Sequence, residues 1–117
     1  MKGLLKFIYS TFGGSIPLKQ QSVILKEDKQ VVAVLVDILY NILHKNVVPA
    51  SEIVINKLSK YKKQIYKLIA KTTSHKARVH ILLQNREIIR IILPLIPSIS
   101  ANLDNEPLYQ DVFNKRK

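Results

Sequence analysis

Hydrophobic residues recur at intervals of three and four along much of this chain, which is the spacing of one face of an α-helix. The first regular run extends from Val31 to Leu43 and predicts a helix over 29–45. Asp28 is placed to cap this helix, because its carboxylate can accept hydrogen bonds from the first backbone amides. The β-branched residues within 31–36 leave a strand open there, but the length of the regular spacing favours the helix.

A second helix is predicted over 51–71, after a short connection that contains Pro49, and Ser51 is suited to be its N-cap. The sides of this helix differ in chemical character. The apolar side contains Val54, Leu58, Tyr61, Ile65 and Leu68. The opposite side contains Lys60, Lys63, Lys67 and Lys71. One side is therefore expected to pack on a protein core, and the other to face solvent or a negatively charged partner.

A third helix is predicted over 75–93, with Ser74 as its N-cap and a bend near Gln84. Pro94 and Pro97 each lack a backbone hydrogen-bond donor, so regular helix is expected to end there. The expected fold is therefore all-α, with three main helices in a small orthogonal or bundle-like domain and extended N- and C-terminal tails.

The end of the third helix is apolar nearly all round, from Ile88 to Ile96. Such a segment is expected to be core, and an oligomer interface or shallow membrane insertion are the alternatives. Its longest uninterrupted apolar run, 91–96, is far shorter than the roughly 20 residues that a membrane-spanning helix needs.

The two ends of the chain are predicted to lie outside the helical domain. Residues 1–28 are expected to be a flexible or partner-ordered tail, 29–97 the basic helical domain, and 98–117 a polar tail. For the first residues, an amphipathic anchor and a secretion signal are the alternatives, although a lysine interrupts the apolar run. The residues available to an anchor are Leu4, Leu5, Phe7, Ile8 and Phe12. The glycines and the proline of 13–18 are expected to interrupt any helix there.

The charge of the chain points to its class of partner. The 117 residues suit one domain and contain 19 lysines and arginines against eight acids, for a net charge of +11. Such a charge attracts polyanions, of which nucleic acid is the first candidate and an anionic membrane surface the second. With five tyrosines, three phenylalanines and no tryptophan, a stacking platform for single strands is poorly supported. The absence of cysteine removes disulfides and thiolate chemistry.

The lysines of the second helix are the sharpest functional signal. On a straight helix, Lys60 and Lys71 would be about 16 Å apart along the axis, a reach of several backbone phosphates. Lysine is a mobile point charge suited to phosphate, whereas base recognition favours arginine, asparagine and glutamine in a groove. Residues 84–86 could contact base edges, but a surface bend is the favoured interpretation, and a merely solvated lysine face is the general alternative. The predicted nucleic-acid-binding residues are Lys57, Lys60, Lys63, Lys67, Lys71, Lys76, Arg78, Arg86 and Arg90.

No arrangement of residues for catalysis or for metal binding can be identified in the sequence. His75 and His80 are separated by about 140° around a helix, so they cannot share one ion from one face. The acids are scattered, and no catalytic or phosphate-loop motif is present. Asp37 is the only acid within the first helix and is expected to be solvated or paired with a lysine. No enzyme activity, metal or cofactor is predicted.

Several short motifs follow one another between the first predicted helix and the third. They are Asn41 and Leu43 before Val48-Pro49, then Leu58 with Lys60, Tyr61 and Lys62, then Ser74, Lys76 and Arg78, then Leu82-Leu83-Gln84. This half of the chain resembles a small basic helical protein of Polinton/Maverick-type elements and adintovirus-like double-stranded DNA viruses. Asn85-Arg86 stands where those proteins commonly have a glycine pair.

The resemblance implies a component of a double-stranded DNA virus or virus-like mobile element that is packaged with the genome. Together with the charge, it leads us to expect sequence-independent nucleic-acid binding by a virion core or accessory protein. Its location would be the virion, or the host nucleus or cytoplasm; a non-viral protein of this kind would be intracellular. The alternatives are a membrane-active amphipathic protein and a capsid-associated adaptor that binds an acidic partner. A capsid protein and a second copy, joined through Ile88–Ile96, are further expected partners.

Overall fold

The chain folds into a series of short helices, and the computed structural model describes residues 2–14, 16–44 and 51–102. The helices are α1 (Lys2–Gly13), α2 (Leu18–Glu27), α3 (Lys29–Leu43), α4 (Glu52–Ser59), α5 (Lys62–Ile69), α6 (His75–Gln84), α7 (Glu87–Ile92), the 3-10 helix η1 (Leu93–Leu95) and α8 (Ile96–Asn102). Within these residues there is no strand, which confirms the all-α prediction. The described residues form more helices than the three main ones that were predicted.

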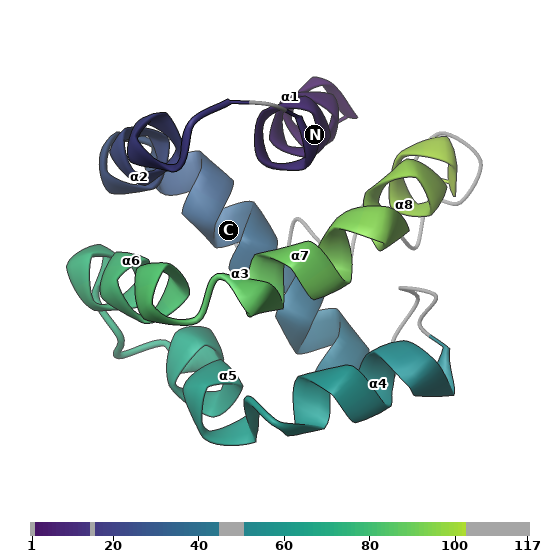
Figure 1. Cartoon of the computed structure of the whole chain (residues 1–117). Coiled ribbons are helices and arrows are strands. Elements are labelled where there is room, and N and C mark those ends of the chain that lie inside the picture. Colours follow the sequence, from purple (N-terminus) through teal and green to yellow (C-terminus); the bar gives the residue numbers. More distant parts are fainter. Residues whose placement is uncertain (1, 15, 45–50, 103–117) are drawn as a thin grey trace.

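The longest helix, α3, is the centre of the molecule. It packs against α1, α2, α5, α6 and α7. Figure 1 shows it passing behind α7, with α1 and α2 along one edge of the molecule and α4 and α5 along the opposite edge. The side chains of Val31, Val34, Leu35 and Ile38 are fully buried. The strand considered for 31–36 is therefore wrong, and the helix prediction is confirmed.

The side-chain caps predicted from sequence are all present. A carboxylate oxygen of Asp28 accepts hydrogen bonds from the amides of Gln30 and Val31, at 3.0 and 3.2 Å. The hydroxyls of Ser51 and Ser74 accept from the amides three residues later, at 3.4 and 3.1 Å. These bonds satisfy amides that have no partner inside the helix, and so they define where α3, α4 and α6 begin.

Asp37 corrects the prediction of a solvated or surface-paired acid. It lies in the middle of α3 and is only 3% exposed. Asn41, one turn later, is also buried, and its side-chain amide donates to the Asp37 carbonyl at 2.7 Å. Because neighbours cover α3 on several sides, even the Asp37 position, which periodicity assigns to its outer face, is enclosed.

The N-terminal residues form helices instead of the extended tail that was predicted. Helix α1 packs against α3, α7 and α8, and α2 packs against α3 and α6. Leu5, Ile8, Phe12 and Leu25 belong to the same buried cluster as α3. The predicted interruption between α1 and α2 is confirmed. At Gly14, a side chain would come within 2.6 Å of the Ser10 carbonyl oxygen, so only glycine fits there without a shift.

The residues predicted as one helix over 51–71 form two helices, α4 and α5. The amide of Tyr61 donates to the Leu58 carbonyl at 2.9 Å, a tight turn that ends α4. The Ser59 hydroxyl donates to the Asn56 carbonyl at 2.6 Å, a back-bond of the kind that bends helices. α4 packs on α7, whereas α5 packs on α3 and α6. The break lets each helix turn its own apolar side to different neighbours.

The predicted third helix is also divided, in part where a bend was expected. α6 ends at Gln84, and α7, η1 and α8 follow in succession. Pro94 lies in the 3-10 helix, but Pro97 lies in the first turn of α8, where a missing backbone donor costs little. Regular helix therefore resumes at Ile96 and includes Pro97, contrary to the prediction. The rest of the predicted C-terminal tail, 103–117, lies outside the described residues.

The apolar run from Ile88 to Ile96 belongs to the core of the same chain. Its buried members are Ile88, Ile89, Ile91, Ile92, Leu93 and Ile96. An oligomer contact built on these side chains would need surface that the chain itself already covers. None of the helices among the described residues combines the length and the apolar content needed to cross a bilayer.

Candidate nucleic-acid interface

Helix α5 has one side that packs on the core and an opposite side that carries lysines, as its sequence predicts. Ile65 and Leu68 are buried against α3 and α6, while Lys63 and Lys67 are exposed. At 100° per residue, the members of each pair lie on one side of the helix, and the two pairs are about 150° apart around its axis. The outer side of α5 therefore presents positive charge to solvent.

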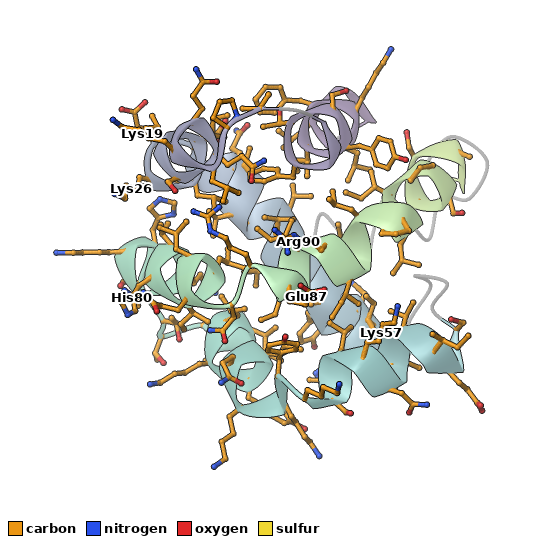
Figure 2. All side chains as sticks on the ribbon, viewed as in Figure 1. Lys19, Lys26, Lys57, His80, Glu87 and Arg90 are labelled. Carbon is orange, nitrogen blue, oxygen red and sulfur yellow. The ribbon has the colours of Figure 1, made fainter. Side chains whose placement is uncertain are left out.

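Exposed lysines continue from α5 onto the neighbouring elements. We call the following set the lysine surface: Lys57, Lys60, Lys62, Lys63, Lys67, Lys71 and Lys76, all of which are exposed. From Lys57 to Arg86 the sequence contains no acid. Among the described residues, none of these lysines forms an ion pair. Figure 2 shows nitrogen-tipped side chains that project outward from the edge formed by α4 and α5, and Lys57 on the side of α4 next to α7.

The break between α4 and α5 changes the geometry that was predicted for these lysines. Lys60 caps the end of α4, and Lys71 lies in the turn after Ala70. The predicted spacing along one straight axis from Lys60 to Lys71 is therefore wrong. The charges follow two short helices and a turn, so they present a bent surface in place of a straight stripe.

Lys62 belongs to the lysine surface although it was not among the predicted binding residues. On a continuous helix it falls close to the apolar side, next to the positions of Leu58 and Ile65. In the structure it is exposed, and its amino group lies 6.0 Å from the centre of the Tyr66 ring. The run of lysines at 60, 62 and 63 was the signal that could have identified it.

Arg78 was predicted to contact nucleic acid, but its guanidinium group forms hydrogen bonds within the fold. Its Nε donates to the Leu68 carbonyl at 2.9 Å, and its Nη2 donates to the Ala70 carbonyl at 3.1 Å. These are carbonyls at the C-terminal end of α5, which carry partial negative charge. The Thr73 hydroxyl caps the same end by donating to the Lys67 carbonyl at 2.5 Å. Arg78 therefore positions the turn that carries Lys71.

The other two predicted arginines lie away from the lysine surface. The Nη2 of Arg86 donates to the Ser22 hydroxyl at 2.8 Å and so ties the α6–α7 turn to α2. The Nη1 of Arg90 lies 3.4 Å from a carboxylate oxygen of Glu87, and both side chains are at least half exposed. Figure 2 shows Arg90 and Glu87 on α7, between the edge formed by α1 and α2 and the edge formed by α4 and α5. The structure thus divides the nine predicted residues into an exposed lysine group and three arginines with other contacts.

Positive charge also occurs on α2, which the predicted site did not include. Lys19 and Lys26 are exposed at the edge of the molecule opposite α4 (Figure 2). The Nε2 of His75 lies 3.0 Å from the Lys26 carbonyl, a contact that joins α6 to α2. His80 is exposed on α6. The described residues contain no group of three or more side chains that could hold a metal ion.

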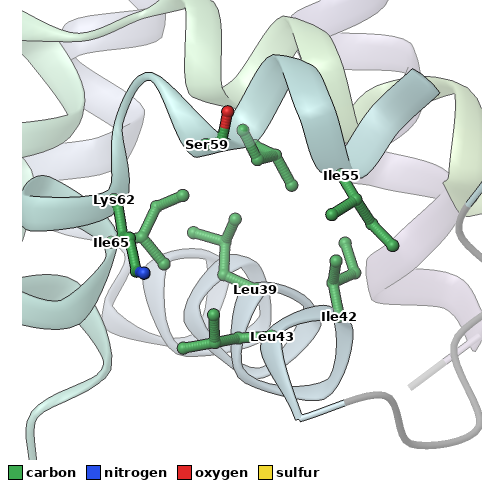
Figure 3. A pocket seen from close by; sticks show the side chains of 8 residues that line it. Leu39, Ile42, Leu43, Ile55, Ser59, Lys62 and Ile65 are labelled. Atoms are coloured by element: carbon green, nitrogen blue, oxygen red, sulfur yellow. The ribbon is translucent and has the colours of Figure 1, made fainter. Parts of the chain in front are cut away.

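A small apolar pocket lies beside Lys62, one member of the lysine surface. It has a volume of about 210 Å³ and is bounded by α3, α4 and α5 (Figure 3). Its lining residues are Leu39, Ile42, Leu43, Ile55, Leu58, Ser59, Lys62 and Ile65. The space between α4, α5 and the C-terminal half of α3 is therefore incompletely filled by side chains.

Comparison of the chain with models of known families, with characterised proteins and with solved structures found no match.

Proposed function

We propose that this protein binds nucleic acid without sequence specificity, through contacts between the lysine surface and backbone phosphates. The observation that carries the proposal is the set of exposed lysines on α4, α5 and the following turn, with no acid in the sequence between Lys57 and Arg86. A surface that served only solubility would gain from acids placed among the lysines, because like charges one turn apart repel each other.

The lysines of the proposed surface are exposed, whereas two of the arginines form bonds within the fold. This difference favours phosphate contact over base recognition. Base edges are recognised by planar, fixed donors such as the arginine guanidinium. Here Arg78 and Arg86 are engaged with the fold itself. The side chains left free on the proposed surface are flexible lysines, which follow the negative charge of a phosphate chain without selecting bases.

The mechanism is the release of counterions from the nucleic acid. Each phosphate that a lysine neutralises releases part of its condensed cation, and this entropy gain favours binding at low salt. If all members of the lysine surface contact duplex DNA, the logarithm of the association constant should fall with the logarithm of salt concentration with a slope of about −6. The resemblance to proteins of Polinton/Maverick-type elements and adintovirus-like viruses leads us to propose a genome-associated virion core or accessory protein.

The proposal is tested by replacing Lys60, Lys63, Lys67 and Lys71 with glutamine and measuring duplex DNA binding by fluorescence anisotropy. A matched control replaces Lys6, Lys19, Lys26 and Lys29, which are also exposed and remove the same charge from other elements. We expect the first variant to lose most of its affinity, the control to lose much less, and duplexes of unrelated sequence to behave alike. Equal losses in the two variants would show that net charge alone determines binding and would contradict the proposed surface.

The membrane-active alternative is less well supported by the packing. Its apolar contacts were expected from residues 4–12 and 88–96, but Leu5, Ile8 and Phe12, with most of the second segment, are buried in the core. Insertion of these side chains into lipid would require α1 and α7 to leave the core. Vesicle flotation with neutral and anionic lipids checks this point: we expect any binding to anionic vesicles to disappear at high salt.

A further inference from the structure

Two depressions adjoin each other on the side of α7 that faces α1 and α2. One has a volume of about 360 Å³ and lies between α7, α2 and the α1–α2 connection. The other has a volume of about 350 Å³ and lies between α1, α7 and η1. Both are lined by Phe12 and Arg90, so they meet at these two residues. We call the combined feature the arginine groove.

The walls of the arginine groove combine polar side chains with apolar side chains, and some of the apolar ones are exposed. Tyr9 and Leu18 line its two ends and keep 44% and 51% of their surface accessible. Pro17 and Ile89 line the part next to α2, and Phe12 lies at the junction. Exposed apolar side chains of this size are unfavourable in water and gain free energy when a partner covers them. Phosphate groups would not provide that cover.

Two guanidinium groups lie along the same groove. Arg86 and Arg90 are four residues apart, so their side chains lie on one side of α7. One nitrogen of Arg86 is held by Ser22, which fixes the side chain at the wall of the groove. Arg90 has an exposed contact with Glu87, and a pair of this kind contributes little and is easily exchanged. The guanidinium fork matches a carboxylate in two parallel hydrogen bonds.

We propose that the arginine groove binds an acidic peptide segment of another protein, with a bulky apolar side chain between Phe12 and Leu18 and an adjacent carboxylate on Arg90. Charge complementarity selects the carboxylates, and the apolar walls select the neighbouring side chain. A volume of about 360 Å³ is at the lower end of ligand-binding pockets, which suits one or two side chains and not a folded surface. This site is separate from the lysine surface and does not depend on nucleic-acid binding.

The experiment measures the anisotropy of a short fluorescein-labelled peptide of alternating glutamate and phenylalanine, titrated with the full chain. Matched peptides carry glutamine for glutamate, or alanine for phenylalanine. The protein variants are Arg90→Gln and Leu18→Ser, both at exposed positions, with Lys57→Gln as a control that removes one charge from α4. Circular dichroism checks that each variant is folded.

We expect Arg90→Gln to weaken binding about tenfold, the size of effect that a charge-assisted bidentate contact produces. Leu18→Ser should weaken it about threefold and Lys57→Gln hardly at all, and both matched peptides should bind more weakly than the original. Equal effects of Arg90→Gln and Lys57→Gln, or equal binding of the glutamine peptide, would overturn the proposal.

A second arm separates this proposal from the nucleic-acid proposal. Saturating duplex DNA should leave most of the peptide bound, because the two ligands occupy different elements. Complete displacement of the peptide by DNA, in the wild type and in Leu18→Ser alike, would show that the peptide binds only to general positive charge and would overturn the groove. Loss of DNA binding alone would contradict only the proposed function.

Discussion

Helices α3 and α5 are both amphipathic in sequence, but they are covered by the fold to very different degrees. α3 has buried residues on nearly every side, including Asp37 and Asn41, whereas α5 buries Ile65 and Leu68 and leaves its lysines in solvent. The comparison shows that the same spacing of apolar residues is compatible with a central helix and with a surface helix. The difference lies in the number of neighbours, and it decides which helix can bind a ligand.

The largest effect should come from truncating the centre of α3. Leu35 is fully buried, so Leu35→Ala should lower the free energy of unfolding by about 2–5 kcal/mol. Tyr66→Ala on the outer side of α5, where the residue is 49% exposed, should cost much less. Urea denaturation of both variants checks the comparison. A loss below about 1 kcal/mol for Leu35→Ala would contradict the central position of α3.

The second-largest effect should come from an arginine that bonds to the C-terminal end of α5, and an exposed lysine nearby provides the comparison. Arg78→Gln removes two hydrogen bonds to the Leu68 and Ala70 carbonyls and should lower the free energy of unfolding by about 2 kcal/mol. Lys76→Gln, two residues earlier and exposed, should leave stability unchanged and weaken DNA binding. Thermal unfolding and anisotropy measured on both proteins separate these roles. A fully stable Arg78→Gln protein would show that these bonds contribute little.

A smaller effect is expected inside α3 from the loss of a polar contact. Asn41→Ala removes the buried donor to the Asp37 carbonyl and should cost about 1–2 kcal/mol. The exposed Asn56→Ala, on α4, is the control and should be close to neutral. Chemical denaturation of the two variants distinguishes them. Equal stability would mean that the buried amide makes no net contribution to the free energy of unfolding.

The smallest effect should come from a helix cap at the edge of the lysine surface. Ser74→Ala leaves the Ala77 amide without its side-chain acceptor and should cost about 1 kcal/mol. Ser51→Ala should cost less, because the corresponding bond is longer, at 3.4 Å. Amide hydrogen exchange in the first turn of α6 reports the loss. Unchanged exchange in Ser74→Ala would contradict a capping role.

The sequence was informative where structure depends on local chemistry. The capping side chains Asp28, Ser51 and Ser74 act on amides two or three residues away, so they could be recognised without a fold. The amphipathic character of α5 was also visible, because its apolar residues need only one covered side. These features established the all-helical class and the exposure of Lys63 and Lys67.

The features that were missed depend on contacts between distant segments. The break at Tyr61 follows from the different neighbours of α4 and α5, which periodicity does not contain. The burial of α1 depends on packing with α8, from the other end of the described chain. Likewise, Arg78 and Arg86 could not be distinguished from the lysines by spacing alone, because their acceptors are the Leu68 and Ala70 carbonyls and the Ser22 hydroxyl.

We propose that the outer side of α4 and α5 binds nucleic-acid phosphates. The most direct test is the salt dependence of duplex DNA binding for the wild type and for the variant with Lys60, Lys63, Lys67 and Lys71 replaced by glutamine. We predict that the slope of the logarithm of the association constant against the logarithm of salt concentration becomes less steep by about 3–4, as expected for four lost phosphate contacts. An unchanged slope would show that these four lysines do not contact the phosphates.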